Sequence, residues 1–321
     1  MLDRVAGAIR TVLERLLLVW LVLLAWIAYC WTDWFGSPPD PFVASKPYLN
    51  YVFAVTMLAI GSLLPRDEVR QLLVSKRTVL GGTAVQFLSM PLLAYGIARL
   101  FGLEGPWLVG MVMVGCVPGA MASNVLTLAA RGNVSYSVSL TASATILSPL
   151  VVPWALWLFL RREVDFPTRD VAWKLCWMVV LPVLIGHGLA ICSSAWATAA
   201  RRVGAIIANL TILWIIAVVV ADNRGQILQT DPQIILALLV VNLGGYAAGI
   251  LGSIVLRLPG PKRRALTMEI GMQNAGLGTL LVTTVTDDPI ARIAPALYTF
   301  GCMLTGTIPA RAWAEWDRRR E

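Results

Sequence analysis

Glu269 is a carboxylate in a position where a carboxylate is costly. It lies inside an apolar run bounded by Arg264 and Asp287, which is long enough to cross a bilayer. A charged side chain near the middle of a membrane span costs roughly 2.5–3.5 kcal/mol on insertion scales unless a partner compensates it. Gln273 stands four residues later, on the same face of a helix, and Asn274 follows directly. This combination predicts that Glu269 belongs to a functional site.

Glycines crowd the same run. Gly271, Gly276 and Gly278 allow the helix to unwind and release backbone carbonyl oxygens. A carboxylate, amides and released carbonyls are hard oxygen ligands, but one carboxylate supplies too little charge for a tight divalent site. Sodium is therefore the predicted ion. The alternative is a protonated Glu269 that hydrogen-bonds to a neighbouring helix.

The composition is that of a polytopic membrane protein. Of the 321 residues, 58% are hydrophobic and only 14% are charged, and the mean hydropathy is +0.73. Soluble domains are about 25% charged. The net charge of +8 does not indicate a nucleic-acid partner, because the basic residues fall in short loops between apolar runs. His187 is the single histidine and the cysteines show no CxxC spacing, which excludes a multi-histidine metal centre and disfavours an intramembrane enzyme.

The apolar runs predict ten membrane spans, and two of them should be broken. Pro118 and Gly119 interrupt the fourth, while the glycines near Glu269 interrupt the ninth. These are matching members of two five-helix halves, which enter the membrane in opposite directions. Interrupted spans at matching positions of inverted repeats point to the central site of a transporter; a pair of ordinary kinked helices is the alternative. The ten predicted spans are 14–32, 47–64, 79–101, 107–130, 133–160, 171–192, 203–222, 233–257, 265–286 and 289–312.

The sequence next to both breaks resembles a known family. Gly119–Val125, Ala130–Val134 with Ser137, and Glu269–Asn274 resemble the two signatures of the bile acid:sodium symporter family. The resemblance implies an all-α membrane protein in which the broken fourth and ninth helices cross inside a core domain. That core would comprise residues 79–161 and 233–313. It would move against a panel domain of residues 14–66 and 171–224.

The resemblance also implies two sodium ions as coupling ions. Transferred motif by motif, the ligands of the first ion are Ser123, Asn124, Ser137, Thr141 and Glu269. Those of the second are Gln86, Gln273, the Glu269 side chain and the backbone oxygens of Ile270 and Met272. Every side chain that the family uses for these two sites is present.

The cargo is less well specified than the ions. Bacterial members that bind bile acids place a His-Asn pair in the tenth helix, and the corresponding segment Phe300–Gly306 has neither residue. The resemblance implies an organic anion as the cargo, either bile-acid-like or a smaller carboxylate such as pantoate or pyruvate, which relatives of similar fold carry. Asn274, at the ninth-helix break, is the candidate substrate contact. The charge of a loaded site would be zero, because two sodium ions carry +2 while Glu269 and a monoanion carry −1 each. A neutral site is the least costly to bury.

Two other functions fit the same residues. One is a proton-coupled carrier in which Glu269 takes up the proton, and the other is a membrane sensor that binds a metabolite without transporting it. The expected partners are the small anion and the lipid bilayer, with no nucleic acid and no obligate protein partner. The expected location is a bacterial inner (cell) membrane with both termini in the cytoplasm, because most of the 26 Lys and Arg residues lie on the side of the termini.

The orientation can be tested by cysteine labelling. We expect the loop at 66–77 to face the cytoplasm and the loop at 161–170 to face the outside. Single cysteines would be placed in each loop of a cysteine-free variant, and intact cells treated with a membrane-impermeant maleimide. We expect labelling of the cysteine in 161–170 and not of the one in 66–77. Labelling only in 66–77 would show that the predicted orientation is wrong.

Overall fold

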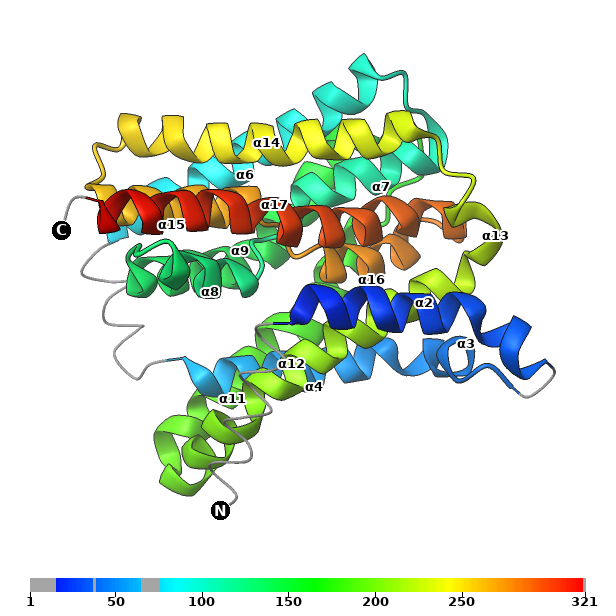
Figure 1. Ribbon diagram of the computed structural model, residues 1–321, viewed down its shortest axis with the longest axis horizontal. Helices are drawn as coiled ribbons and strands as arrows, with labels where there is room; N and C mark the ends of the chain where they lie inside the picture. The colour runs from blue at the N-terminus through cyan, green and yellow to red at the C-terminus, as the bar shows by residue number, and fades with distance from the viewer. Residues whose placement is uncertain (1–15, 37–38, 65–75, 320–321) are drawn as a thin grey trace. The chain divides into compact units, whose positions relative to one another are not determined.

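The computed structural model describes residues 16–36, 39–64 and 76–319, and the regular structure of this part is helical (Figure 1). The chain forms two compact units. The smaller unit comprises Met1–Arg66 and Trp173–Gln229, and the larger unit comprises Asp67–Ala172 and Thr230–Glu321. The basic residues before residue 16 and in the loop 65–75, on which the predicted orientation partly depends, lie outside the described residues.

Each unit is assembled from two stretches of chain. The smaller unit contains α2 (Leu17–Phe35), α3 (Pro41–Ser45), η1 (Lys46–Tyr48), α4 (Leu49–Leu63), the π-helical turn η2 (Cys176–Val180), α11 (Leu181–Cys192), α12 (Ser194–Asp222) and α13 (Arg224–Ile227). The larger unit contains α6 (Lys76–Leu100), α7 (Gly105–Cys116), α8 (Ala122–Ala129), α9 (Val134–Leu160), α14 (Pro232–Val255), α15 (Gly260–Gly271), α16 (Ala275–Val285), η3 (Pro289–Arg292) and α17 (Ile293–Arg318). Helix α10 (Thr168–Leu175) begins in the larger unit and ends in the smaller one, because the division between the units falls between Ala172 and Trp173.

Seven helical segments within the described residues are long and apolar enough to cross a membrane, and the expectation of a polytopic all-α membrane protein is confirmed. Three shorter apolar helices accompany them: Val19–Phe35, Gly105–Cys116 and Ala275–Val285. The last two belong to the predicted fourth and ninth spans, each of which is divided at the expected residues. The arrangement of ten spans as two inverted repeats stays a prediction.

One helix begins earlier than its hydropathy indicates. Helix α12 starts at Ser194 rather than near residue 203, because Ser193 caps it by accepting a hydrogen bond from the backbone N–H of Trp196. Arg201 and Arg202, which the sequence places in a loop, therefore lie inside the helix as exposed residues. Hydropathy marks the apolar part of a helix, whereas its start is decided by the cap.

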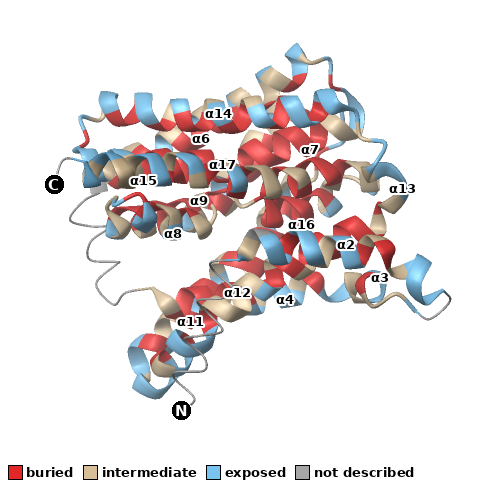
Figure 2. Cartoon of the chain, viewed as in Figure 1, coloured by how far each residue is buried: buried red, intermediate tan, exposed pale blue. Residues whose placement is uncertain are grey.

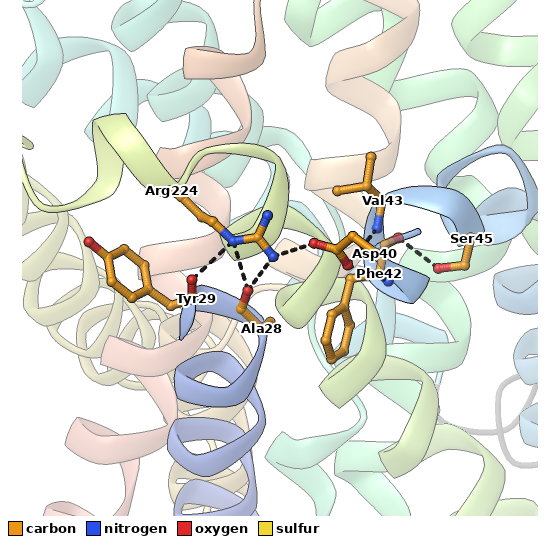
Figure 3. Close-up of polar contacts among 7 residues, drawn as sticks. All are labelled: Ala28, Tyr29, Asp40, Phe42, Val43, Ser45 and Arg224. Atoms are coloured by element: carbon orange, nitrogen blue, oxygen red, sulfur yellow. Dashed lines mark hydrogen bonds and ion pairs between the residues drawn. The ribbon is translucent and has the colours of Figure 1, made fainter. Parts of the chain in front are cut away.

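Arg224 ties three elements of the smaller unit together (Figure 3). Its guanidinium donates to the backbone carbonyls of Ala28 (2.9 Å from Nε) and Tyr29 (3.0 Å from Nε) in α2, and it forms an ion pair with Asp40. Asp40 also accepts a hydrogen bond from the N–H of Phe42 (2.9 Å) and so caps α3. One cation thus joins the interior of α2 to the N-terminal ends of α3 and α13.

The larger unit encloses its broken helices. Within it, α14 packs against α6 and α15, α8 runs beside α15, and α16 packs against α7 and α17 (Figure 1). Helix α7 is buried from Leu108 to Cys116 and α16 from Ala275 to Val282, and α7 is largely red in Figure 2. Helices α6 and α14 instead expose large apolar side chains such as Leu88 and Leu251. This arrangement is required physically, since unwound backbone is tolerated at membrane depth only where protein or a polar cavity surrounds it.

Candidate functional site

The two helix breaks of the larger unit are joined through their backbones. After α7 and α15 end, the two connecting segments become extended and pair as a short antiparallel bridge. The N–H of Ala120 donates to the carbonyl of Met272 (2.8 Å), and the N–H of Asn274 donates to the carbonyl of Pro118 (2.8 Å). The four half-helices α7, α8, α15 and α16 therefore meet at one place, with the N-termini of α8 and α16 and the C-termini of α7 and α15 near the bridge.

Glu269 lies at this place and is completely buried, with 0% of its surface exposed. The Ser123 hydroxyl, from α8, donates to Oε2 (2.5 Å), and the Thr141 hydroxyl, from α9, donates to Oε1 (2.7 Å). Each hydroxyl oxygen still has lone pairs after donating its proton, so it can bind a cation at the same time. A Cβ atom at position 119 would overlap Oε1 of Glu269, which explains the glycine there.

Two further residues predicted for the first ion lie on the same helices as these hydroxyls. Ser137 is one turn before Thr141 on α9, and its hydroxyl pairs with that of Thr127 (3.2 Å) rather than with Glu269. Asn124 follows Ser123 directly, and its Nδ2 makes only a long contact with the sulfur of Met121 (3.8 Å). Its Oδ1 is buried and has no hydrogen-bond partner within the described part of the chain, so it is an available oxygen ligand.

The residues predicted for the second ion also come together. Gln86 and Gln273 are each 1% exposed, and Nε2 of Gln86 donates to Oε1 of Gln273 (3.3 Å). Nε2 of Gln273 in turn donates to the carbonyl of Ile270 (2.7 Å). The carbonyls of Ile270 and Met272 each accept one hydrogen bond, and a carbonyl oxygen has a second lone pair for a cation. Oε1 of Gln86 is buried with no partner among the residues described.

The sequence analysis missed two hydroxyls in this region. Thr127 is fully buried and stands one turn after Ser123, and its hydrogen bond to Ser137 joins α8 to α9 next to the Glu269 carboxylate. Thr83 is 2% exposed, three residues before Gln86, and its hydroxyl finds no partner in the described residues. Thr83 lies three residues before Gln86, and Thr127 lies four residues after Ser123, so each shares a helix face with a predicted ligand. Single hydroxyls are common at membrane helix contacts, however, and alone they do not indicate an ion site.

Asn274 occupies the start of α16. Its Oδ1 accepts the N–H of Leu277 (3.1 Å), which makes it the N-cap of that half-helix. Its Nδ2 is not needed for the cap, and the residue is partly exposed, unlike the buried residues on either side. Asn274 thus combines a helix N-terminus with a free amide donor, both of which favour an anion.

The oxygen-bearing groups at the crossing are the Glu269 carboxylate, several hydroxyls, the side-chain amides of Asn124, Gln86 and Gln273, and backbone carbonyls. Within the described residues, no three His, Cys, Asp or Glu side chains lie together in a way that could hold a metal ion. Unwound carbonyls and half-helix C-termini beside a single carboxylate are the arrangement that binds Na⁺ or H⁺ in transporters with broken helices.

Comparison with known proteins identifies the family. The model of the Sodium Bile acid symporter family matches residues 51–230, more than half of the chain. The chain belongs to this family. The matched region contains Gln86 and the fourth-span break, while Glu269 lies beyond it.

Relatives in this family extend the match over most of the chain. The uncharacterized sodium-dependent transporter YocS of Bacillus subtilis is 28% identical over 303 residues, which cover 94% of this chain and 92% of that protein. The probable sodium/metabolite cotransporter BASS1 of Arabidopsis thaliana is 29% identical over 81% of this chain and 65% of its own length. The ileal sodium/bile acid cotransporter of Oryctolagus cuniculus is 28% identical over 75% of this chain and 70% of its own length.

A solved structure supports the fold. The sodium proton antiporter MjNhaP1 of Methanocaldococcus jannaschii matches with a TM-score of 0.57 at 12% identity, over 98% of this chain and 95% of that one. At this identity the likeness concerns the fold alone. The family and the integral membrane class predicted from the sequence are confirmed, and the relatives support sodium as the coupling ion.

Gly119→Ala should damage the site without removing a ligand. The added methyl would push the Glu269 carboxylate away from Ser123 and Thr141. We expect apparent sodium affinity to fall roughly tenfold, equivalent to about 1.4 kcal/mol, which is within the usual cost of overpacking. The measurement is the sodium-dependent rise in melting temperature of the purified protein. Gly278→Ala is the matched control, because its new Cβ would lie at 3.5 Å or more from its neighbours; equal sodium responses in the two variants would contradict the geometry.

Proposed function

We propose that this protein is a sodium-coupled symporter that moves a small organic anion across a bacterial cell membrane without changing it chemically. The observation that carries the proposal is the complete burial of Glu269 between two hydroxyls at the crossing of two broken helices. A buried carboxylate in a membrane is expensive and is a functional group by default. The membership in a sodium symporter family supports the same conclusion.

The ion sites follow from the arrangement of oxygen atoms. The first ion would bind between α8, α9 and Glu269, with Ser123, Asn124, Ser137 and Thr141 as ligands. Binding there requires Ser137 to share its hydroxyl between Thr127 and the ion. The second ion would bind on the other side of the break in α15, between Gln86, Gln273, the carboxylate of Glu269 and the backbone oxygens of Ile270 and Met272. Because Glu269 is common to both sites, the two ions would bind interdependently.

The cargo would be a monoanion. Two sodium ions and one carboxylate leave a charge of +1 at the crossing, and a bound monoanion neutralises it before the site moves through a low-dielectric environment. Asn274, with its amide donor and the N-terminus of α16, would meet this anion. Pantoate, pyruvate and a bile acid are the first anions to test.

The two structural units would be the moving parts. The larger unit would be the core of residues 79–161 and 233–313 that carries the ions, and the smaller unit would be the panel of residues 14–66 and 171–224. Alternating access would then be a displacement of one unit against the other around a fixed ion site. The distribution of basic residues supports cytoplasmic termini for this arrangement.

Glu269→Gln tests the proposal directly. The amide keeps the shape and one acceptor oxygen for the hydroxyls but removes the charge, and a neutral amide is easier to bury than a lone carboxylate. We expect a folded protein whose sodium-driven uptake into vesicles is abolished and whose melting temperature no longer responds to sodium. Gln86→Ala should be milder, since it affects one ion site.

Glu104→Gln is the matched control, because Glu104 is an exposed glutamate of the same unit. Uptake that persists in Glu269→Gln with a sodium gradient alone would refute the proposal. Uptake that in the native protein ignores sodium and follows an inward proton gradient would instead select a proton-coupled carrier. Binding of anions without uptake would select a sensor.

Asn274→Ser tests the cargo contact. Serine keeps an oxygen that can cap α16 but removes the amide donor, so sodium-dependent stabilisation should be retained. We expect affinity for the transported anion to fall roughly tenfold, as for the loss of one hydrogen bond to a charged group. Affinity would be measured by thermal shift with pantoate, pyruvate or a bile acid in the presence of sodium. An unchanged affinity would remove Asn274 from the cargo site.

A further inference from the structure

The carbonyl oxygen of Gly271 receives two side-chain hydrogen bonds from outside its own helix. Nδ2 of Asn242, in α14, donates to it at 2.7 Å, and the hydroxyl of Tyr298, in α17, donates to it at 3.0 Å. Gly271 is the last residue of α15, where carbonyls lose their partners in the helix. Two donors from two different helices therefore hold this end of α15.

The two donors are themselves fixed in orientation. Asn242 is 2% exposed and Tyr298 is 1% exposed. The Gly271 carbonyl can only accept a hydrogen bond, so the Asn242 amide must turn its Nδ2 toward it; Oδ1 then faces the Thr305 hydroxyl (2.6 Å). The Asn242 amide also reaches the Tyr298 hydroxyl at 3.4 Å. None of these three residues belongs to the sodium ligands assigned above.

Gly271 is also restricted from its Cα side. A Cβ atom there would overlap the ring of Tyr246, which packs directly on the glycine. The backbone has only two soft dihedral angles per residue, and anchoring the Gly271 carbonyl fixes the peptide plane between residues 271 and 272. The carbonyls of Ile270 and Met272 belong to the two neighbouring peptide planes. Each of these planes is joined to the anchored one through a single Cα atom, so anchoring the Gly271 carbonyl limits the directions that the flanking carbonyls can take.

We propose that Asn242 and Tyr298 are positioning residues of the second sodium site. They hold the middle carbonyl of three and so limit rotation of the two adjacent peptide planes, which keeps the carbonyls of Ile270 and Met272 directed at the ion. The inference rests on the proposed function, because it needs a sodium ion at those two oxygens. It assigns a role in ion affinity to α14 and α17, which supply no sodium ligand.

The test compares two buried tyrosines, of which only Tyr298 donates its hydroxyl proton to Gly271. Tyr298→Phe removes a hydroxyl that donates to Gly271. Tyr246→Phe removes a hydroxyl from the same cluster that reaches the Thr305 hydroxyl (3.3 Å) and the Cys302 carbonyl (3.4 Å) but not Gly271. Full-length purified variants would be titrated with sodium chloride against choline chloride at constant ionic strength, with melting temperature as the readout.

We expect Tyr298→Phe to raise the sodium concentration for half-maximal stabilisation about tenfold, equivalent to about 1.4 kcal/mol. In Tyr246→Phe, the sodium concentration for half-maximal stabilisation should stay within about twofold of the native value. This hydroxyl does not contact Gly271, and a tenfold change would correspond to the loss of a whole hydrogen bond. If Tyr298 had a purely structural role, Tyr298→Phe would lower the melting temperature in choline chloride but leave the sodium concentration for half-maximal stabilisation unchanged. That result would overturn the proposal. Equal shifts in the two variants would overturn it as well.

Two further arms keep the test decisive. Asn242→Leu removes the second donor at similar volume and should shift the sodium midpoint in the same direction; it replaces Tyr298→Phe if that variant does not purify as a single species. A native protein that shows no sodium response refutes the proposed function itself. A native protein that responds, with Tyr298→Phe titrating identically, refutes only the role of the two positioning residues.

Discussion

The structure of the larger unit depends on keeping one carboxylate inside a membrane protein. Glu269 has no exposed surface, and a carboxylate taken out of water must be compensated locally. The compensation visible here comes from two hydroxyls on two other helices, with the N-terminus of α8 close by. The helix breaks, the glycine at position 119 and the small hydroxyl residues on α8 and α9 all serve this requirement. A larger residue at position 119 would occupy the volume of the carboxylate itself.

The sequence was most informative where a residue type is unfavourable inside a membrane span. A charge, a proline and several glycines in apolar runs are unusual enough to indicate the broken helices and the place of the ion site without a structure. The resemblance to a family then supplied residue roles that spacing could not. The membrane class and family are confirmed, whereas the individual ion ligands stay proposals supported by their proximity.

Other features depended on contacts that no local pattern records. The pairing of residues 118–120 with 272–274 joins segments about half the chain apart, and backbone hydrogen bonds leave no signal in side-chain types. Asn242 and Tyr298 are ordinary polar residues in membrane helices, and their shared acceptor becomes visible only when α14 and α17 are packed against α15. The start of α12 at Ser194 shows the same limit on a smaller scale, because hydropathy does not register a cap.

The antiparallel bridge between the two breaks has a consequence for how such a protein can evolve. Its hydrogen bonds run between main-chain atoms at Pro118, Ala120, Met272 and Asn274, so the crossing does not depend on most of the side chains displayed there. Side chains near the bridge that neither contact Glu269 nor belong to the proposed ion ligands can therefore be exchanged by mutation while the backbone crossing stays intact. Selection for a different cargo would then act on a few side chains, while the main-chain hydrogen bonds that join the two breaks are retained.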